Sequence, residues 1–197
     1  MHPVPPELAG HPDRLKWNAR YSGITPSFSP HPLAGQALAL AMPDGPVLEL
    51  ACGPSGSALL AATAGRPVTA VDASDVGLGL LAAEARRRGL DGLITPVLAD
   101  LGSWRPPAAT FSLVLCTGYW DRAIFSPAAS AVRDGGLLAW EALTEAARRD
   151  RPHLPAEWCV GPGEPASLLP AGFVVLSQQD AGPEPPPRRR LLARRGD

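Results

Sequence analysis

The sequence contains no long run of apolar residues. No stretch approaches the roughly 20 apolar residues that a membrane-spanning helix needs, and the opening stretch MHPVPPELAGHPDR lacks the apolar centre of a signal peptide. At 197 residues the chain has room for one domain with a full hydrophobic core but not for two. We therefore expect a single globular domain that stays in the cytoplasm and does not enter a membrane.

A strong excess of charge is also missing. The formal net charge is −1 and Lys16 is the only lysine, so there is no general electrostatic reason to expect a nucleic acid or an anionic membrane as partner. The 4 histidines share no metal-ligand spacing, and the 3 cysteines are odd in number and unspaced for zinc. We predict no metal site, buried free thiols in a reducing compartment, and a monomer or a homodimer.

Short apolar runs alternate with helical stretches through the middle of the chain. Strands are predicted at residues 47–51, 68–73, 93–100, 111–118 and 136–143, and helices at 31–42, 57–65, 76–89 and around 127–133. This alternation is typical of stacked right-handed βαβ units, and therefore of a mostly parallel sheet with helices on both faces.

The two ends of the chain have a different character. Residues 1–13 are predicted to form a flexible lead, and residues 15–23 mix aromatic and charged residues without a clear period. At the other end, strand-like runs at 172–180 and 188–196 flank a turn-rich stretch, which predicts an antiparallel hairpin. The arginines of 188–195 are expected on the outer face of an edge strand, where positive charge discourages edge pairing.

The stretch VLELACGPSGSALL places a glycine turn between a predicted strand and a predicted helix. In an open α/β sheet, ligands bind beyond the carboxyl ends of the strands, where the strand order reverses. Gly53 and Gly56 allow a sharp turn and a close approach of the backbone to a ligand. A dinucleotide site requires a second glycine where Ser55 stands, so the turn departs from a pyrophosphate-binding pattern.

Acidic residues occur near the ends of the first three predicted strands. Glu49 lies in an otherwise buried strand, where its carboxylate needs a positive ligand group or the turn amides as partner. Asp72 follows the glycines by about 20 residues, the spacing at which an acid accepts hydrogen bonds from ribose hydroxyls. Asp100 ends the third strand and is placed to accept from an adenine amino group. These acids describe a cationic, ribosylated ligand without phosphate, and S-adenosylmethionine has these properties.

A family resemblance supports this interpretation. The runs ELACGPSG, VTAVDAS, ADL, FSLVLCTGYWDR and DGGLLAWEAL resemble the ordered motifs of the class I S-adenosylmethionine-dependent methyltransferases. Within that class the chain is most similar to the small bacterial tellurite-resistance (TehB-like) group, from about Trp17 to Arg195. The resemblance implies an α/β, Rossmann-like, doubly wound fold with a mostly parallel seven-stranded sheet, a C-terminal antiparallel hairpin and helices on both faces.

The resemblance also divides the chain. A single methyltransferase domain would span residues 14–197. Within it, residues 14–45 would form an opening segment with a helix, 46–145 the cofactor-binding core, and 146–197 the substrate-side segment with the hairpin.

The resemblance implies a role for each matching position in the cofactor site. The glycine turn would surround the methionine part of the cofactor, Asp72 would hold the ribose, and Asp100 with Leu101 would face the adenine. Arg20 and Tyr21 would close over the methionine end. The complete predicted set of cofactor-binding residues is Arg20, Tyr21, Glu49, Cys52, Gly53, Ser55, Gly56, Asp72, Ala73, Ser74, Asp100, Leu101, Cys116 and Thr117, the last two beneath the transferable methyl group.

The residues after the fourth strand are predicted to meet the methyl acceptor. Tyr119, Trp120, Asp121 and Arg122 are the candidate substrate residues. The aromatic side chains provide a wall or a stacking surface, and Asp121 is placed to take a proton or to hold a cationic substrate. Tyr119, Asp121 and Arg122 are the catalytic candidates, but we expect positioning rather than base catalysis, because methyl transfer from a sulfonium depends mainly on alignment and desolvation.

Several of these residues have a purely structural alternative. Asp72 and Asp100 also suit the caps of the segments that follow them. Cys116, like Cys52, also suits a small apolar filler. Trp120 suits the core as well as a substrate wall, and Asp121 and Arg122 suit a surface ion pair with each other.

We predict S-adenosylmethionine-dependent methyl transfer to a small-molecule acceptor. The first alternative is a protein that binds the cofactor without transferring its methyl group. An NAD-linked oxidoreductase would share the turn and Asp72, but Ser55 and Glu49 oppose it. RNA methylation remains a third alternative, whereas CTGYW lacks the Asn/Asp-Pro-Pro-aromatic motif of enzymes that methylate DNA bases or protein glutamine.

Overall fold

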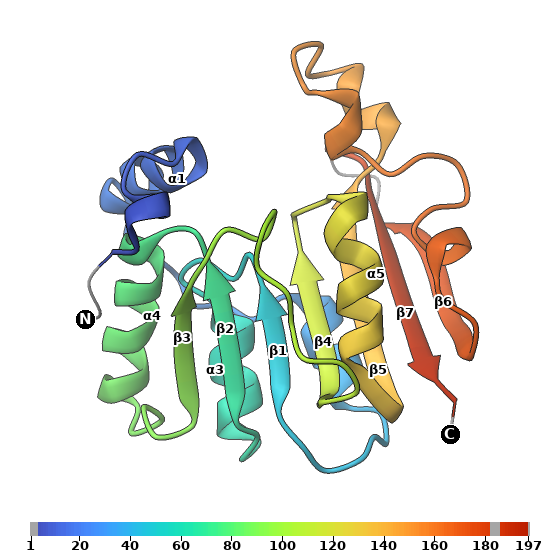
Figure 1. Ribbon diagram of the computed structural model, residues 1–197, viewed down its shortest axis with the longest axis horizontal. Coiled ribbons are helices and arrows are strands. Elements are labelled where there is room, and N and C mark those ends of the chain that lie inside the picture. The colour runs from blue at the N-terminus through green and yellow to red at the C-terminus, as the bar shows by residue number, and fades with distance from the viewer. Residues whose placement is uncertain (1–3, 182–185, 197) are drawn as a thin grey trace.

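The protein forms one twisted sheet of seven strands in the order β3-β2-β1-β4-β5-β7-β6 (Figure 1). The computed structural model describes residues 4–181 and 186–196. The strands are β1 Val47–Leu50, β2 Val68–Asp72, β3 Ile94–Leu98, β4 Phe111–Thr117, β5 Val132–Leu143, β6 Phe173–Ala181 and β7 Arg188–Arg195. Strands β1 to β5 run parallel, and β7 pairs antiparallel with both β5 and β6. The predicted fold class and the C-terminal hairpin are confirmed; residues 182–185 of its connecting stretch lie outside the described residues.

The helices cover both faces of the sheet. The α-helices are α1 Pro12–Ser22, α2 Pro32–Leu38, α3 Gly56–Thr63, α4 Asp75–Arg87 and α5 Arg122–Ala131, and 3-10 helices occur at Pro6–Leu8, Glu145–Arg148, Ala156–Trp158 and Ala166–Leu168. Alternate residues of the central strands enter two separate cores, one under α5 and the other under α2, α3 and α4. Because both faces are covered, the central strands read as continuous apolar runs.

The arginine-rich strand is not at the edge of the sheet, so that prediction is wrong. Strand β7 lies between β5 and β6, and its arginines pair with acids of neighbouring segments, including Glu141, Asp180 and Asp134. The edge strand is β6, although its sequence is the more apolar of the two. Local sequence could not reveal this order, because it depends on where the last strand is inserted.

The N-terminal segment is more regular than its composition indicates. The predicted lead contains a 3-10 helix in which Leu8 is buried, and helix α1 starts at Pro12, so the predicted boundary at 13/14 falls inside a helix. No residue of α1 is fully buried, which explains why it carries no apolar period. The helix is held by polar contacts instead: Asn18 Nδ2 and Arg14 Nε both donate to Asp75 Oδ1 at 2.7 Å.

Two segments stand beyond the carboxyl ends of the parallel strands. In Figure 1, α1 and the connection between β5 and β6 both lie at the top, the end toward which β1, β2 and β4 point. Helix α5 begins earlier than predicted, at Arg122, because the Asp121 carboxylate accepts from the Ala123 amide at 2.8 Å and caps it. These segments are therefore positioned around the end of the sheet where ligands bind in α/β folds.

Candidate cofactor and acceptor site

The turn after β1 combines two left-handed residues. Gly53 has φ 52° and Ala51 has φ 49°, a region that residues with a Cβ atom rarely adopt. Strain of this kind concentrates at ligand sites. Sequence reasoning drew attention to the glycines and missed Ala51, since only a known backbone path reveals the strain.

Ser55 is a structural part of this turn. Its hydroxyl accepts from the amides of Ser57 and Ala58, both at 3.0 Å, and so caps α3, while it donates to the Glu49 carboxyl group at 2.8 Å. Gly56 faces away from the turn, because a Cβ there would lie 2.3 Å from the Phe28 carbonyl oxygen. The serine that replaces a glycine of the dinucleotide pattern therefore stabilises the start of α3.

Glu49 is buried behind the turn with little to neutralise it. The side chain is 2% exposed, and in the described part of the chain no cationic side chain forms an ion pair with it. Burial raises the pKa of Glu49 to about 8, against the opposing effect of the hydrogen bond from Ser55. Glu49 is therefore mostly protonated at neutral pH.

Asp72 links the turn after β1 to the turn after β2. It is 5% exposed, and its carboxylate accepts from the amides of Gly53 and Ser74, each at 2.7 Å. Burial raises the pKa of Asp72 to about 6, although these amides oppose the rise. Ser74 in turn caps α4 through the Gly77 amide and donates to Asn18 Oδ1 at 2.6 Å, which fastens α1 to this edge.

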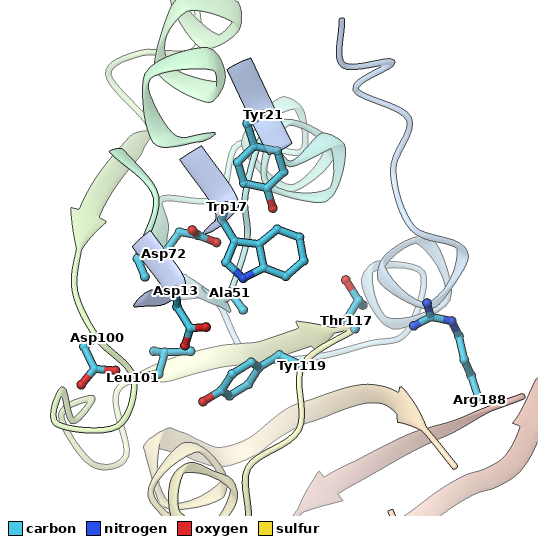
Figure 2. A pocket seen from close by; sticks show the side chains of 12 residues that line it. Asp13, Trp17, Tyr21, Ala51, Asp72, Asp100, Leu101, Thr117, Tyr119 and Arg188 are labelled. Atoms are coloured by element: carbon cyan, nitrogen blue, oxygen red, sulfur yellow. The ribbon is translucent and has the colours of Figure 1, made fainter. Parts of the chain in front are cut away.

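A cavity of about 260 Å³ opens at these turns (Figure 2). Of the predicted cofactor residues, Tyr21, Asp72, Ala73, Asp100, Leu101 and Thr117 line it. The structure adds Asp13, Trp17, Ala51, Gly118 and Arg188, which sequence reasoning missed, and Tyr119, which it had assigned to the methyl acceptor. Asp13, Trp17 and Tyr21 recur every four residues and so share one face of α1, a spacing that is visible in the sequence once the helix is known.

The other predicted cofactor residues do not line this cavity. They are Arg20, Glu49, Cys52, Gly53, Ser55, Gly56, Ser74 and Cys116. Arg20 is exposed and lies over the Trp17 ring, with its guanidinium carbon 5.6 Å from the ring centroid. Cys116 belongs to the core under α5, where burial raises its pKa and keeps it a thiol, and burial does the same for Cys52. Both cysteines therefore have the properties of small core fillers.

Tyr21 covers the glycine turn. A Cβ at Gly53 would lie 2.5 Å from the Tyr21 hydroxyl oxygen, and one at Gly77 would lie 2.9 Å from the ring. These glycines therefore make room for the ring, which stacks on Trp17 at a centroid distance of 5.6 Å. Figure 2 shows both rings over the cavity, with Asp100 and Arg188 at opposite ends of it. Burial and the nearby Asp72 raise the pKa of Tyr21, so the phenol stays neutral.

Asp100 caps the turn that follows it and also faces the cavity. Its carboxylate accepts from the Gly102 amide at 2.9 Å and from the Ser103 hydroxyl at 3.2 Å, which is the capping alternative. It also lines the cavity. The remaining lone pairs of Asp100 are thus available to a ligand.

A second cavity of about 430 Å³ adjoins the first. The two share the residues Asp13, Trp17, Asp100, Gly118 and Tyr119. The second cavity is further lined by His11, Lys16, Gly102, Trp120, Asp121, Leu143, Leu154, Glu157 and Trp158. The structure therefore provides two neighbouring binding volumes with a common wall.

Three of the four predicted acceptor residues line the second cavity, namely Tyr119, Trp120 and Asp121. Arg122 does not; it pairs with Glu164 through two hydrogen bonds of 2.8 and 2.7 Å, which replaces the predicted ion pair with Asp121. Trp120 combines both of its alternatives, because it packs on Phe125 and also forms cavity wall. Burial, with Asp121 nearby, raises the pKa of Tyr119, so its hydroxyl is a hydrogen-bond donor and not a base.

Arg188 reaches the first cavity from β7 and is held there by Glu141. The distance from Arg188 Nη1 to Glu141 Oε1 is 3.4 Å, and Arg190 Nε lies 2.6 Å from Glu141 Oε2. His31 Nε2 completes the group at 3.2 Å from Oε1. Burial alone would raise the pKa of Glu141, but the hydrogen bonds from His31 and Arg190 outweigh it and lower the pKa to about 2.

Comparison with known families identifies the class. Residues 47–136 match the family model described as a methyltransferase domain. The matched segment runs from β1, through the glycine turn and the Asp72 turn, into β5. With the sheet order, this match supports the predicted class I methyltransferase domain, whose cofactor is S-adenosylmethionine. The narrower likeness to the tellurite-resistance group is one of fold. A comparison with curated proteins found no match.

Solved structures show the same fold at low sequence identity. The chain superposes on TehB from Haemophilus influenzae with a TM-score of 0.69 at 15% identity, covering 91% of this chain and 67% of that one. A protein described by the conversion of a disulfide bond into a thioacetal group during echinomycin biosynthesis gives 0.67 at 19%, covering 93% and 92%. Magnesium protoporphyrin IX methyltransferase from Synechocystis PCC 6803, with bound SAH, gives 0.62 at 17%, covering 93% and 83%. These likenesses establish the fold and leave the acceptor open.

Within residues 4–181 and 186–196, no helix is long and apolar enough to cross a membrane. Over the same residues, no group of three or more His, Cys, Asp or Glu side chains is arranged to hold a metal ion.

Proposed function

We propose that the protein transfers the methyl group of S-adenosylmethionine to a small-molecule acceptor bound in the second cavity. The observation that carries this proposal is the shared wall between the two cavities, which includes Tyr119 and Gly118 at the end of β4. Methyl transfer requires donor and acceptor to meet in line within van der Waals reach. Two volumes that meet at the end of β4 supply that arrangement.

The first cavity supports a cofactor placed along the strand ends. Asp72 and Ala73 would meet the ribose, and Asp100 with Leu101 the adenine, since all four line the cavity. Thr117 would lie by the methyl group. Arg188, which no sequence pattern indicated, supplies a positive charge that suits the carboxylate of the methionine part. The methionine part would reach Gly53 only after the Tyr21 ring moves, because that ring covers the turn.

The proposed step needs little acid or base chemistry from the protein. A lone pair of the acceptor forms the bond to the methyl carbon, and the carbon–sulfur bond breaks with its electrons left on sulfur, giving S-adenosylhomocysteine. The positive charge of the sulfonium is dispersed in the transition state, so alignment and exclusion of water supply much of the rate. Tyr119 would position the acceptor as a donor, and Asp121 would receive a proton from an acceptor that must lose one.

We further propose that the protein acts in the cytoplasm. Cys52, Cys116 and Cys159 are all free, which suits a reducing compartment. The formal net charge of −1 favours a small molecule over RNA as the acceptor.

The test is turnover with a panel of simple acceptors. The protein is incubated with S-adenosylmethionine and, separately, a thiol, selenite, tellurite, a phenol and an amine, and S-adenosylhomocysteine is quantified. We expect the product to accumulate with at least one acceptor and not with the Asp72→Ala variant. Binding of S-adenosylhomocysteine without turnover on any acceptor would favour a cofactor-binding protein instead.

A further inference from the structure

The wall of the second cavity holds an ammonium group between two indole rings. Lys16 Nζ lies 5.4 Å from the centroid of the Trp17 ring and 4.9 Å from that of the Trp158 ring. Trp17 belongs to α1, whereas Trp158 ends the 3-10 helix Ala156–Trp158 of the connection between β5 and β6. A cation between aromatic faces is the arrangement by which proteins recognise alkylated ammonium ligands.

The charge of this cavity also favours a cation. Its lining includes the acids Asp13, Asp100, Asp121 and Glu157, against Lys16 and His11. Acids of one sign in a partly enclosed cavity concentrate positive ligands near them. Lys16 offsets only part of this negative charge, and it is exposed and carried on a flexible stem.

A third indole belongs to the same wall. Trp120 is 3% exposed, and its indole Nε1 has no hydrogen-bond partner in the described part of the chain. A buried N–H group without a partner is unfavourable. Trp120 lines the cavity together with both indoles that flank Lys16, so three indole rings contribute to the wall of this one cavity.

We propose that the methyl acceptor is a cationic amine, and that its ammonium group takes the place between Trp17 and Trp158 that the Lys16 ammonium fills in this structure. The inference rests on the proposed function and names its substrate class. Lys16 is then an internal stand-in for the substrate, displaced when the amine binds. Trp17 lines both cavities, so an ammonium over its ring lies at the wall shared with the cofactor, and the amine nitrogen is the methyl acceptor.

The chemical step balances without a further reactant. The bound ammonium gives one proton to the solvent or to a cavity carboxylate such as Asp121. The freed lone pair on nitrogen forms a bond to the methyl carbon, and the electrons of the carbon–sulfur bond remain on sulfur. The products are the N-methylated ammonium ion and S-adenosylhomocysteine.

The test compares two ligands that differ in one atom. Choline and 3,3-dimethylbutan-1-ol have the same shape, with a quaternary nitrogen in one and a carbon in the other. Their dissociation constants are measured by saturation-transfer NMR titration on the full chain, both with and without S-adenosylhomocysteine. We expect choline to bind about tenfold more tightly than its neutral isostere.

Variants assign this preference to the proposed place. Lys16→Met removes the internal ammonium but keeps the stem, and should tighten choline binding about threefold, whereas Trp158→Leu should reduce the preference to below about twofold. The control is Arg87→Met, which removes an exposed cation of α4 that lines neither cavity, and it should leave choline binding unchanged. Trp158 is 46% exposed, so its replacement does not open the core.

The inference is overturned if the isostere binds as tightly as choline, or if Lys16→Met and Arg87→Met behave alike. These results are independent of the proposed function, because titration with S-adenosylhomocysteine alone reports on the first cavity. Loss of that binding with a retained choline preference would contradict the methyl-transfer proposal and leave the cation site standing.

Discussion

Two buried glutamates of the central sheet have opposite surroundings. Glu49 on β1 and Glu141 on β5 are each 2% exposed. Glu141 lies beside two arginines of β7 and the imidazole of His31, which precedes α2, and its pKa is lowered to about 2. Glu49 has a serine hydroxyl as its side-chain partner, and burial raises its pKa to about 8. The fold has thus neutralised one buried carboxyl group with its own cations and left the other without any.

This difference separates structure from function. The ion group around Glu141 fastens β7 to β5 and positions Arg188 at the cavity wall, which is a task of the fold. Glu49 sits behind the turn that begins the cofactor site, where a positively charged ligand is expected. A buried carboxyl group with no protein cation beside it is unfavourable unless it stays protonated or meets a ligand.

The largest expected effect is the loss of folding stability on replacing Glu141, compared with the loss on replacing Glu49. Glu141→Gln leaves the surrounding cations without their counter-charge and should lower the free energy of unfolding by about 3 kcal/mol. Glu49→Gln replaces a protonated carboxyl group with a group of the same shape and should cost less than about 1 kcal/mol. Urea denaturation measures both. Equal losses would show that the contrast in charge has no energetic consequence.

The next effect concerns the cofactor. Asp72→Ala removes the carboxylate that holds the amides of Gly53 and Ser74, and should weaken S-adenosylhomocysteine binding by about 100-fold, since each charge-assisted hydrogen bond contributes about 1.5 to 3 kcal/mol. Asp134→Asn is the matched control, because Asp134 is 65% exposed and pairs with Arg195 away from the cavity. Similar affinities for the two variants would contradict the assignment of the site.

The pH dependence of stability should have opposite signs for the two glutamates. The folded pKa of Glu141 is below its ordinary value of 4.5, so its contribution is present above pH 4.5 and is lost as the pH falls toward about 2. The folded pKa of Glu49 is above 4.5, so its contribution is present below that pH and is lost as the pH rises toward about 8. Stability relative to Glu141→Gln should therefore fall in acid, whereas stability relative to Glu49→Gln should fall between pH 4.5 and about 8.

The smallest effect should come from Ser55. Ser55→Ala removes the cap of α3 and the partner of Glu49, and should cost about 1 kcal/mol of stability. Since Ser55 does not line the cavity, cofactor affinity should change by less than about threefold. Ser130→Ala, at an exposed position of α5, is the control. A large loss of affinity with intact stability would mean that Ser55 contacts the ligand directly.

Sequence reasoning succeeded where local pattern and burial coincide. The apolar runs of β1, β2 and β4 are buried on both faces, so their period and their flanking turns identified them. Asp72 and Asp100 were found because strand ends in a parallel sheet meet at one edge. Helix α1 escaped, because none of its residues is fully buried and its contacts are polar.

The site was only partly predictable for a related reason. The motif identified residues near the site but not which way their side chains point. In the structure Glu49, Gly56 and Cys116 pack behind the cavity and do not line it. Lys16 and Trp158 lie far apart in the sequence and meet only in the folded chain. No local sequence pattern predicts a contact between residues that are so far apart in the chain.

The most direct test of the account is a calorimetric titration of the wild-type protein with S-adenosylhomocysteine, with NADH as the comparison ligand. The account predicts saturable binding of S-adenosylhomocysteine to one site per chain and no heat of binding with NADH. Absence of S-adenosylhomocysteine binding at high micromolar concentration, or tighter binding of NADH, would contradict it.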